Sequence, residues 1–197
     1  MLIRHARPHH VTDPTRVADP DLTPEGERQA QDLADFLTAA PHGVVTSLFA
    51  STMQRAVQTA TPLEKALGLP FDTDPRIVEV DSGWTSYGVG LDTYPSRRAA
   101  WDDMNRGRLG DNVFDPNEFS ARVVAGLEDM IARDSGNDSI AAVVCHGGVI
   151  SAYLAHILKI PRMFFVDTAY TSITRINADA DGYREVISVN EATHVRP

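Results

Sequence analysis

Residues 140–158 read IAAVVCHGGVISAYLAHIL, and this stretch decides the fold. Its first six residues are uncharged and β-prone, which is typical of a strand that is buried on both faces. The segment 147–158 follows as a helix, with a histidine between the two elements. A buried strand that leads directly into a helix is the unit of a parallel sheet, so we expect an α/β fold.

The same alternation extends along the chain in both directions. The chain is expected to fold as one domain over residues 1–197, without repeats or linkers and with an irregular lid around 82–116 that is rich in Gly, Asp, Pro and Trp. The architecture expected is a three-layer α/β/α sandwich with a mostly parallel, mixed central sheet. The other expected elements are strands at 1–4, 44–50 and 76–80, helices at 24–39, 53–67 (bent or restarted at Pro62), 95–105 and 117–133, and a terminal hairpin of 172–178 and 183–190.

Composition narrows the classes of function and partner. The 197 residues carry a formal net charge of −9, which argues against a general nucleic-acid or anionic-membrane surface. No apolar run is long enough to span a membrane, and arginines interrupt any signal-peptide pattern near the N-terminus. The single cysteine, Cys145, excludes an internal disulfide. We therefore expect a cytoplasmic protein, whose oligomeric state the sequence does not indicate.

Two expected strands end in a histidine. LIRH ends at His5 and VVCH ends at His146. Ligands of open α/β sheets bind beyond the carboxyl ends of the strands, so both imidazoles are expected in one pocket. Cys145 alternates to the other side of its strand and is expected in the core. Gly147 and Gly148 open the next helix, where backbone N–H groups favour an anion.

Arginines accompany these histidines. Arg4 precedes His5, and Arg55 begins the helix after the strand at 44–50, again at the strand-exit side. Arginine disfavours a protonated imidazole nearby, so this neighbourhood suits a neutral, nucleophilic histidine beside an anion. Two arginines and two histidines at one edge have the composition of a phosphate site.

Five segments in order resemble landmarks of the histidine phosphatase superfamily, also called the phosphoglycerate mutase-like family. LIRHARP (2–8) is similar to its Arg-His-Gly opening, and LFASTMQRAVQTATPL (48–63) keeps its Ser-x-x-x-Arg-Ala-x-x-Thr-Ala pattern. The remaining three are DPDLTPEGERQAQDLADFL (19–37), RIVEVDSGW (76–84) and VVCHGGVI (143–150). An Arg-His pair alone is common, but five matches in order are specific.

The resemblance implies a fold, a reaction and a set of roles. His5 would attack phosphorus and form a phosphohistidine, and Glu79 would protonate the leaving oxygen. No metal or other cofactor is expected, because guanidinium and imidazole groups supply the positive charge. The phosphate-binding residues implied by the resemblance or by their place at the strand ends are Arg4, Arg55, His146 and Gly147.

Several assignments stay open. Asp81 would share a strand face with Glu79 and is the alternative acid, although the spacing of Glu79 to Gly83 fits the family. Ala6 stands where the family has glycine, and its methyl group would either crowd the phosphate or rest against the core. Arg7 and Arg16 are candidates for a second anionic contact with substrate.

Rival functions are weighed on the same residues. Metal binding through His5, His9 and His10 is disfavoured by the intervening proline and by the absence of a known ligand pattern. A cofactor-dependent phosphoglycerate mutase-type phosphotransferase would use the same core, but the compact chain favours a phosphatase. A non-catalytic phosphate-binding protein would not need His5 and a carboxylate. The sequence thus predicts a metal-independent phosphomonoesterase for a small phosphorylated substrate.

Overall fold

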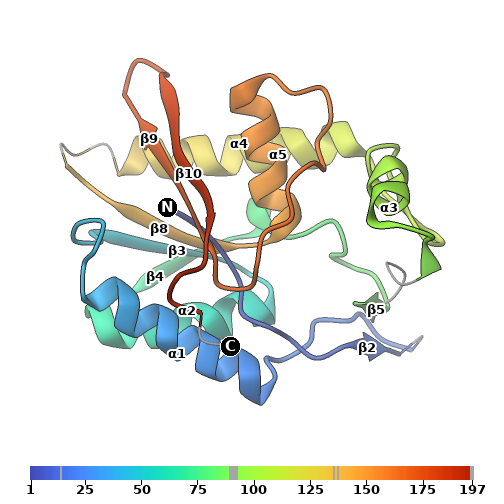
Figure 1. Cartoon of the computed structure of the whole chain (residues 1–197), viewed down its shortest axis with the longest axis horizontal. Coiled ribbons are helices and arrows are strands. Elements are labelled where there is room, and N and C mark those ends of the chain that lie inside the picture. Colours follow the sequence, from blue (N-terminus) through green and yellow to red (C-terminus); the bar gives the residue numbers. More distant parts are fainter. Residues whose placement is uncertain (14, 89–92, 135, 137, 196–197) are drawn as a thin grey trace.

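The computed structural model describes the whole chain except residues 14, 89–92, 135, 137 and 196–197. Its centre is a six-stranded sheet in the order β10-β9-β1-β8-β3-β4 (Figure 1). Neighbouring strands among β1, β8, β3 and β4 are parallel, and β9 is antiparallel to β1 and to β10. The mostly parallel, mixed sheet is confirmed. The strands are β1 (Leu2–Arg4), β3 (Ser47–Ser51), β4 (Phe71–Asp74), β8 (Ala141–Cys145), β9 (Ile173–Ala178) and β10 (Arg184–Glu191).

Helices cover both faces of the sheet, which completes the three layers (Figure 1). The helices α1 (Pro24–Thr38) and α2 (Gln54–Leu67) pack on one face, where they bury Ile3 and Val144. The helices α4 (Pro116–Arg133) and α5 (Gly147–Leu158) pack on the other face, where they bury Leu2 and Val143. Successive residues of β1 and β8 thus alternate between two cores, as the period of a strand requires.

Local sequence explains where the site-bearing helices begin. Thr23 accepts a hydrogen bond from the Gly26 N–H at 3.0 Å, and Pro24 takes the first helical position of α1. The helix α2 runs without a break through Pro62. The helix was expected either to bend or to restart at this proline, and it does not restart. The helix α5 follows β8 after only His146, which is its N-cap residue.

Two expectations about the strands are wrong. Residues 76–80 do not form a strand, because Pro75 starts a 3-10 helix, η1 (Pro75–Ile77), that Asp74 caps through its carboxylate. Directly before Pro75, the sequence FDTD forms the strand β4, which its polar composition did not predict. The strand β3 is also displaced from 44–50 to Ser47–Ser51, and Val44 is exposed.

The segment 82–116 is irregular, as expected, with short elements inside it. These are β5 (Ser86–Tyr87), α3 (Arg97–Met104), β6 (Arg108–Leu109) and β7 (Asn112–Val113). The strand β5 pairs with β2 (Val11–Thr12) of the first loop in a small sheet of its own. Residues 89–92 of the expected lid lie outside the described residues.

None of the helices in the described part of the chain combines the length and the apolar character that crossing a bilayer requires.

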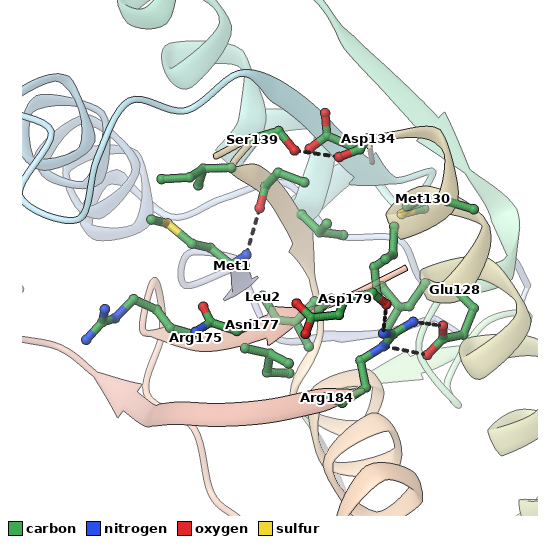
Figure 2. A pocket seen from close by; sticks show the side chains of 18 of the residues that line it. Met1, Leu2, Glu128, Met130, Asp134, Ser139, Arg175, Asn177, Asp179 and Arg184 are labelled. Atoms are coloured by element: carbon green, nitrogen blue, oxygen red, sulfur yellow. Dashed lines mark hydrogen bonds and ion pairs between the residues drawn. The ribbon is translucent and has the colours of Figure 1, made fainter. Parts of the chain in front are cut away.

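A cavity of about 1140 Å³ opens between α4, the start of β8 and the β9–β10 hairpin. Figure 2 shows Arg184 beside Glu128 on one side of it and Met1 on the other. Arg184 is paired with Glu128, and the Met1 amine donates to the Ala141 carbonyl at 2.7 Å. This cavity lies at the end of the sheet where β8 begins, and none of the predicted site residues lines it.

Candidate active site

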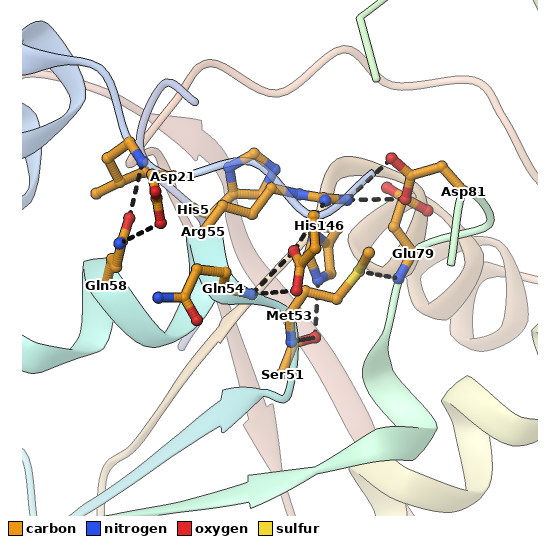
Figure 3. Close-up of polar contacts among 12 residues, drawn as sticks. His5, Asp21, Ser51, Met53, Gln54, Arg55, Gln58, Glu79, Asp81 and His146 are labelled. Carbon is orange, nitrogen blue, oxygen red and sulfur yellow. Dashed lines mark hydrogen bonds and ion pairs between the residues drawn. The ribbon is translucent and has the colours of Figure 1, made fainter. Parts of the chain in front are cut away.

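His5 and His146 lie side by side at the carboxyl ends of β1 and β8. These strands are hydrogen-bonded neighbours, with Arg4 opposite Cys145, and the His5 N–H donates to the Cys145 carbonyl at 2.9 Å. The two imidazole centroids are 5.0 Å apart, and both side chains are buried (Figure 3). The expectation that two strand ends bring both histidines together is confirmed. Cys145 lies in the core, where burial raises the pKa of its thiol to about 12.

The hydrogen bond of His5 determines which of its nitrogens can react. Its Nδ1 lies 2.7 Å from the carbonyl oxygen of Ala6. A carbonyl only accepts hydrogen bonds, so Nδ1 carries the proton and Nε2 keeps its lone pair. Burial, followed by the charges of Arg55 and Arg4, holds the pKa of His5 well below its usual range. His5 is therefore a neutral imidazole with a free Nε2 at physiological pH.

Ser51 sets the orientation of the second histidine. Its hydroxyl oxygen lies 2.8 Å from Nε2 of His146 and accepts a bond from the Met53 N–H at 3.3 Å. A hydroxyl oxygen can accept two hydrogen bonds, so the direction of the Ser51 proton sets the tautomer: where the hydroxyl donates to Nε2, the proton of the imidazole is on Nδ1. Nδ1 is buried and has no hydrogen-bond partner among the described residues. In that tautomer, His146 can donate one hydrogen bond to an anion beside it.

Two arginines add fixed positive charge, and with the two histidines they form what we call the basic cluster. Arg55 in the first turn of α2 is fully buried, and its Nη2 donates to both carboxylate oxygens of Asp81 at 2.8 and 3.1 Å. Arg4 donates through Nη1 to the Thr168 carbonyl. Within the described chain, Nε of each arginine and Nη1 of Arg55 are buried without a hydrogen-bond partner. Buried polar atoms are normally satisfied, so these donors are suited to an incoming oxyanion.

Glu79 lies beside this cluster, at the start of α5. Its carboxylate accepts from the Gly148 N–H at 2.7 Å and from the Val80 N–H at 3.0 Å. Burial is the main cause that raises its pKa, and the charge of Asp81 adds to it. A carboxyl group with a raised pKa next to a group of fixed positive charges can hold and deliver a proton.

Asp81 differs from Glu79 in its partner. Its carboxylate is committed to Arg55, whereas both oxygens of Glu79 meet only backbone N–H donors in the hydrogen bonds above. Burial raises the pKa of Asp81 as well, but the Arg55 charge and hydrogen bond oppose that rise. In this arrangement Asp81 holds Arg55, whereas Glu79 forms no ion pair within the described part of the chain.

Gly148 offers a direct test of this arrangement. A Cβ atom at this position would lie 2.2 Å from Oε1 of Glu79, so Gly148→Ala must displace the carboxyl group. We expect turnover to fall on the order of tenfold or more, most for poor leaving groups, while the fold survives because a flexible side chain can move. Steady-state kinetics with thermal unfolding check this. Wild-type turnover in the variant would contradict the placement of Glu79.

The remaining predicted residues divide into two groups. Gly147 lies next to the cluster, because a Cβ there would be 3.7 Å from Nε of Arg4. Ala6 is buried against Leu22 and Ala30, so its methyl group rests on the core. Arg7 and Arg16 are exposed and bind nearby carboxylates, at 2.7 Å to Glu25 and 2.9 Å to Asp13 respectively. The structure does not bring these two side chains into the cluster, and their predicted contact with substrate stays a prediction.

Sequence reasoning missed several residues of the site. Ser51 begins a quoted motif and could have been found there. Gly148 was expected to offer its N–H to an anion, and in the structure that N–H binds Glu79. Tyr87, in the short strand β5, and Tyr170, in a turn before β9, contact the arginines, and no local pattern marks them.

The chain belongs to the histidine phosphatase superfamily. Residues 1–191 match the family model for branch 1 of this superfamily. The Arg-His start of the family pattern and its second histidine are thus the residues that meet at the ends of β1 and β8.

Curated relatives include phosphoglycerate mutase-like proteins and phosphatases. The chain is 30% identical over 149 residues to a probable phosphoglycerate mutase GpmB of Enterobacter sp. (strain 638). It is 29% identical over 150 residues to a glucosyl-3-phosphoglycerate phosphatase of Mycolicibacterium vanbaalenii. Each match covers 73% of this chain but less than two thirds of the relative, 66% and 65% respectively.

Solved structures share the fold over almost the whole chain. A mycobacterial glucosyl-3-phosphoglycerate phosphatase complexed with VO3 superposes with a TM-score of 0.76 at 21% identity, covering 97% of this chain and 98% of that one. A phosphoserine phosphatase of Entamoeba histolytica with 3-phosphoglyceric acid gives 0.74 at 18% identity, covering 99% and 98%.

Proposed function

We propose that this protein is a metal-independent phosphomonoesterase that acts on a small phosphorylated substrate through a phosphohistidine intermediate. The observation that carries the proposal is the free Nε2 of His5, held beside Arg4, Arg55 and His146 by the Nδ1 bond to Ala6. A binding protein would need the positive charges but not an imidazole with its lone pair exposed to the anion.

In the first step, the lone pair of His5 Nε2 attacks phosphorus, and the bond between phosphorus and the ester oxygen breaks. Glu79 donates its proton to that oxygen, which leaves as an alcohol. Arg4, Arg55 and the Nδ1–H of His146 bind the phosphoryl oxygens, whose charge must be stabilised in the transition state. The buried donors without partners described above supply these contacts.

In the second step, water attacks the phosphohistidine. Glu79, now ionised, accepts a proton from the water, and the bond between His5 Nε2 and phosphorus breaks. The products are inorganic phosphate and the enzyme in its starting protonation state. The same carboxyl group therefore serves as acid and then as base, which is why its pKa must lie above that of an exposed glutamate.

The proposed substrate class is supported by the ligands and activities of two proteins that share this fold. One fold neighbour is a phosphatase that forms a complex with VO3, and another is a phosphoserine phosphatase that binds 3-phosphoglyceric acid. These facts support a small phosphorylated substrate for this chain. Screening phosphomonoesters for release of inorganic phosphate tests the proposal, and failure on every ester would overturn it.

Phosphoglycerate mutase-type transfer is the second candidate, because one curated relative is a probable phosphoglycerate mutase. The two functions differ in the fate of the phosphoryl group. Conversion of 3-phosphoglycerate to 2-phosphoglycerate, without free phosphate, would favour the mutase.

Chelation tests the metal-independent chemistry. We expect hydrolysis of p-nitrophenyl phosphate to be unchanged after prolonged dialysis against EDTA, because two guanidinium groups balance the charge of the phosphoryl oxygens and the His146 imidazole donates a hydrogen bond to them. Initial rates before and after dialysis are the measurement. Activity lost on chelation and restored by one divalent metal would contradict the proposal.

We further propose a cytoplasmic location and no nucleic-acid partner. The net charge of −9 supports the second point, and the single buried cysteine is consistent with a reducing compartment. Cell fractionation with a tagged protein tests the location.

A further inference from the structure

Two tyrosines cover the two arginines of the basic cluster. The guanidinium carbon of Arg4 lies 4.2 Å from the centroid of the Tyr170 ring, and that of Arg55 lies 4.5 Å from the centroid of the Tyr87 ring. At these distances the flat guanidinium groups interact with the faces of the rings. Each phosphate-binding cation therefore has an aromatic ring of its own.

The same two rings also approach the nucleophile. The imidazole centroid of His5 is 6.4 Å from the Tyr87 ring and 5.7 Å from the Tyr170 ring. A hydrogen bond to Tyr170 is one of the causes, after burial, that raise the pKa of the Tyr87 phenol. Each ring therefore lies close both to an arginine and to His5.

The tyrosines come from segments on different parts of the fold, and each segment is held in place. Tyr87 belongs to β5, which is paired with β2. Tyr170 lies directly before Thr171, whose backbone has a φ of 57° and whose N–H donates to the Arg4 carbonyl at 3.0 Å. Both tyrosines are therefore fixed by the backbone around them, Tyr87 by strand pairing and Tyr170 by the hydrogen bond of the next residue to Arg4.

We propose that Tyr87 and Tyr170 form an aromatic bridge over the basic cluster, which selects phosphomonoesters whose ester oxygen carries a slender group. The proposal rests on the proposed function and names the residues that limit its substrates. Beneath the bridge, His5 is only 2% exposed and Arg55 is fully buried. A phosphoryl group must therefore reach beneath the phenols, and the group attached to it must lie beside them. By this proposal, a fused ring system or a folded polypeptide attached to the ester oxygen would collide with the phenols.

Phenyl phosphate and 1-naphthyl phosphate are the probes, since their leaving groups have similar acidity and differ mainly in width. We expect kcat/KM of the wild type to favour phenyl phosphate on the order of tenfold or more. Tyr87→Ala and Tyr170→Ala should each bring the ratio of the two kcat/KM values towards one. A loss of structure alone would lower both values and leave their ratio unchanged.

Phenylalanine variants separate the rings from the hydrogen bond between them. Tyr87→Phe and Tyr170→Phe keep both rings over the arginines, so most of the selectivity should remain. The inference is overturned if the wild type does not distinguish the two esters, if neither alanine variant changes the ratio, or if the phenylalanine variants lose as much selectivity as the alanine variants. Should one alanine variant fail to fold in thermal unfolding, the other variants decide. A wild type that hydrolyses no phosphomonoester at all would instead refute the proposed function.

Discussion

His5→Ala is expected to abolish both turnover and the acid-labile phosphoryl label, while inorganic phosphate still binds. The variant removes the Nε2 lone pair that attacks phosphorus but keeps the donors of Arg4, Arg55 and His146. The intermediate is measured as protein-bound label that forms rapidly after mixing with 32P-labelled substrate and is lost on treatment with acid. Calorimetry measures phosphate binding.

A histidine outside the cluster provides the matched control. His156 is exposed on α5, so His156→Ala should leave turnover and label unchanged. Near-normal turnover in His5→Ala, or label on His146 in the wild type, would show that His5 is not the nucleophile.

Glu79→Gln should lower turnover about 10²–10⁴-fold for alkyl phosphates, the usual contribution of general acid–base catalysis. Glutamine keeps the size of the side chain but has no proton of suitable acidity to give to the leaving oxygen. With p-nitrophenyl phosphate, whose leaving group needs little protonation, the loss in the phosphorylation step should be much smaller. A pre-steady-state comparison of the two substrates isolates this step from the hydrolysis of the phosphohistidine.

Asp81→Asn is the neighbouring variant that distinguishes the two carboxylates. It weakens the ion pair with Arg55, so it should impair both substrates to a similar degree through weaker phosphate binding. If Asp81→Asn shows the dependence on leaving group and Glu79→Gln does not, the roles of the two residues are reversed.

Much of the basic cluster was predictable because its residues come directly after strands. His5 and His146 each follow a short β-prone run, and the rule that parallel strands end at one edge places both in one pocket. Arg55 was located in the same way, from the strand and helix around it. Strand direction placed these three residues at one edge of the sheet, and the joint pattern of the ordered motifs gave them their predicted roles.

Other features of the fold and the site could not be predicted from the local sequence. FDTD alternates polar and apolar residues poorly, yet β4 pairs with β3 because tertiary context overrides its weak propensity. RIVEV has the composition of a strand, but Pro75 and the Asp74 cap turn its start into a 3-10 helix. The contact of Gly148 with Glu79 and the rings of Tyr87 and Tyr170 over the arginines join distant segments, so no spacing in the sequence reports them.

The pairing of β1 with β8 has a consequence for biosynthesis. In this pairing, Leu2 lies opposite Val143 and Arg4 lies opposite Cys145. The strand β1 is therefore synthesised long before the strand β8 with which it pairs. Contacts of such long sequence separation form slowly, because a large loop must close before they stabilise the fold. A nascent chain that lacks β8 therefore has His5 but no second imidazole beside it. Recovery of activity after dilution from denaturant then requires the pairing of β1 with β8, while the pairing of β1 with β9, which places Leu2 opposite Thr174, closes a still longer loop.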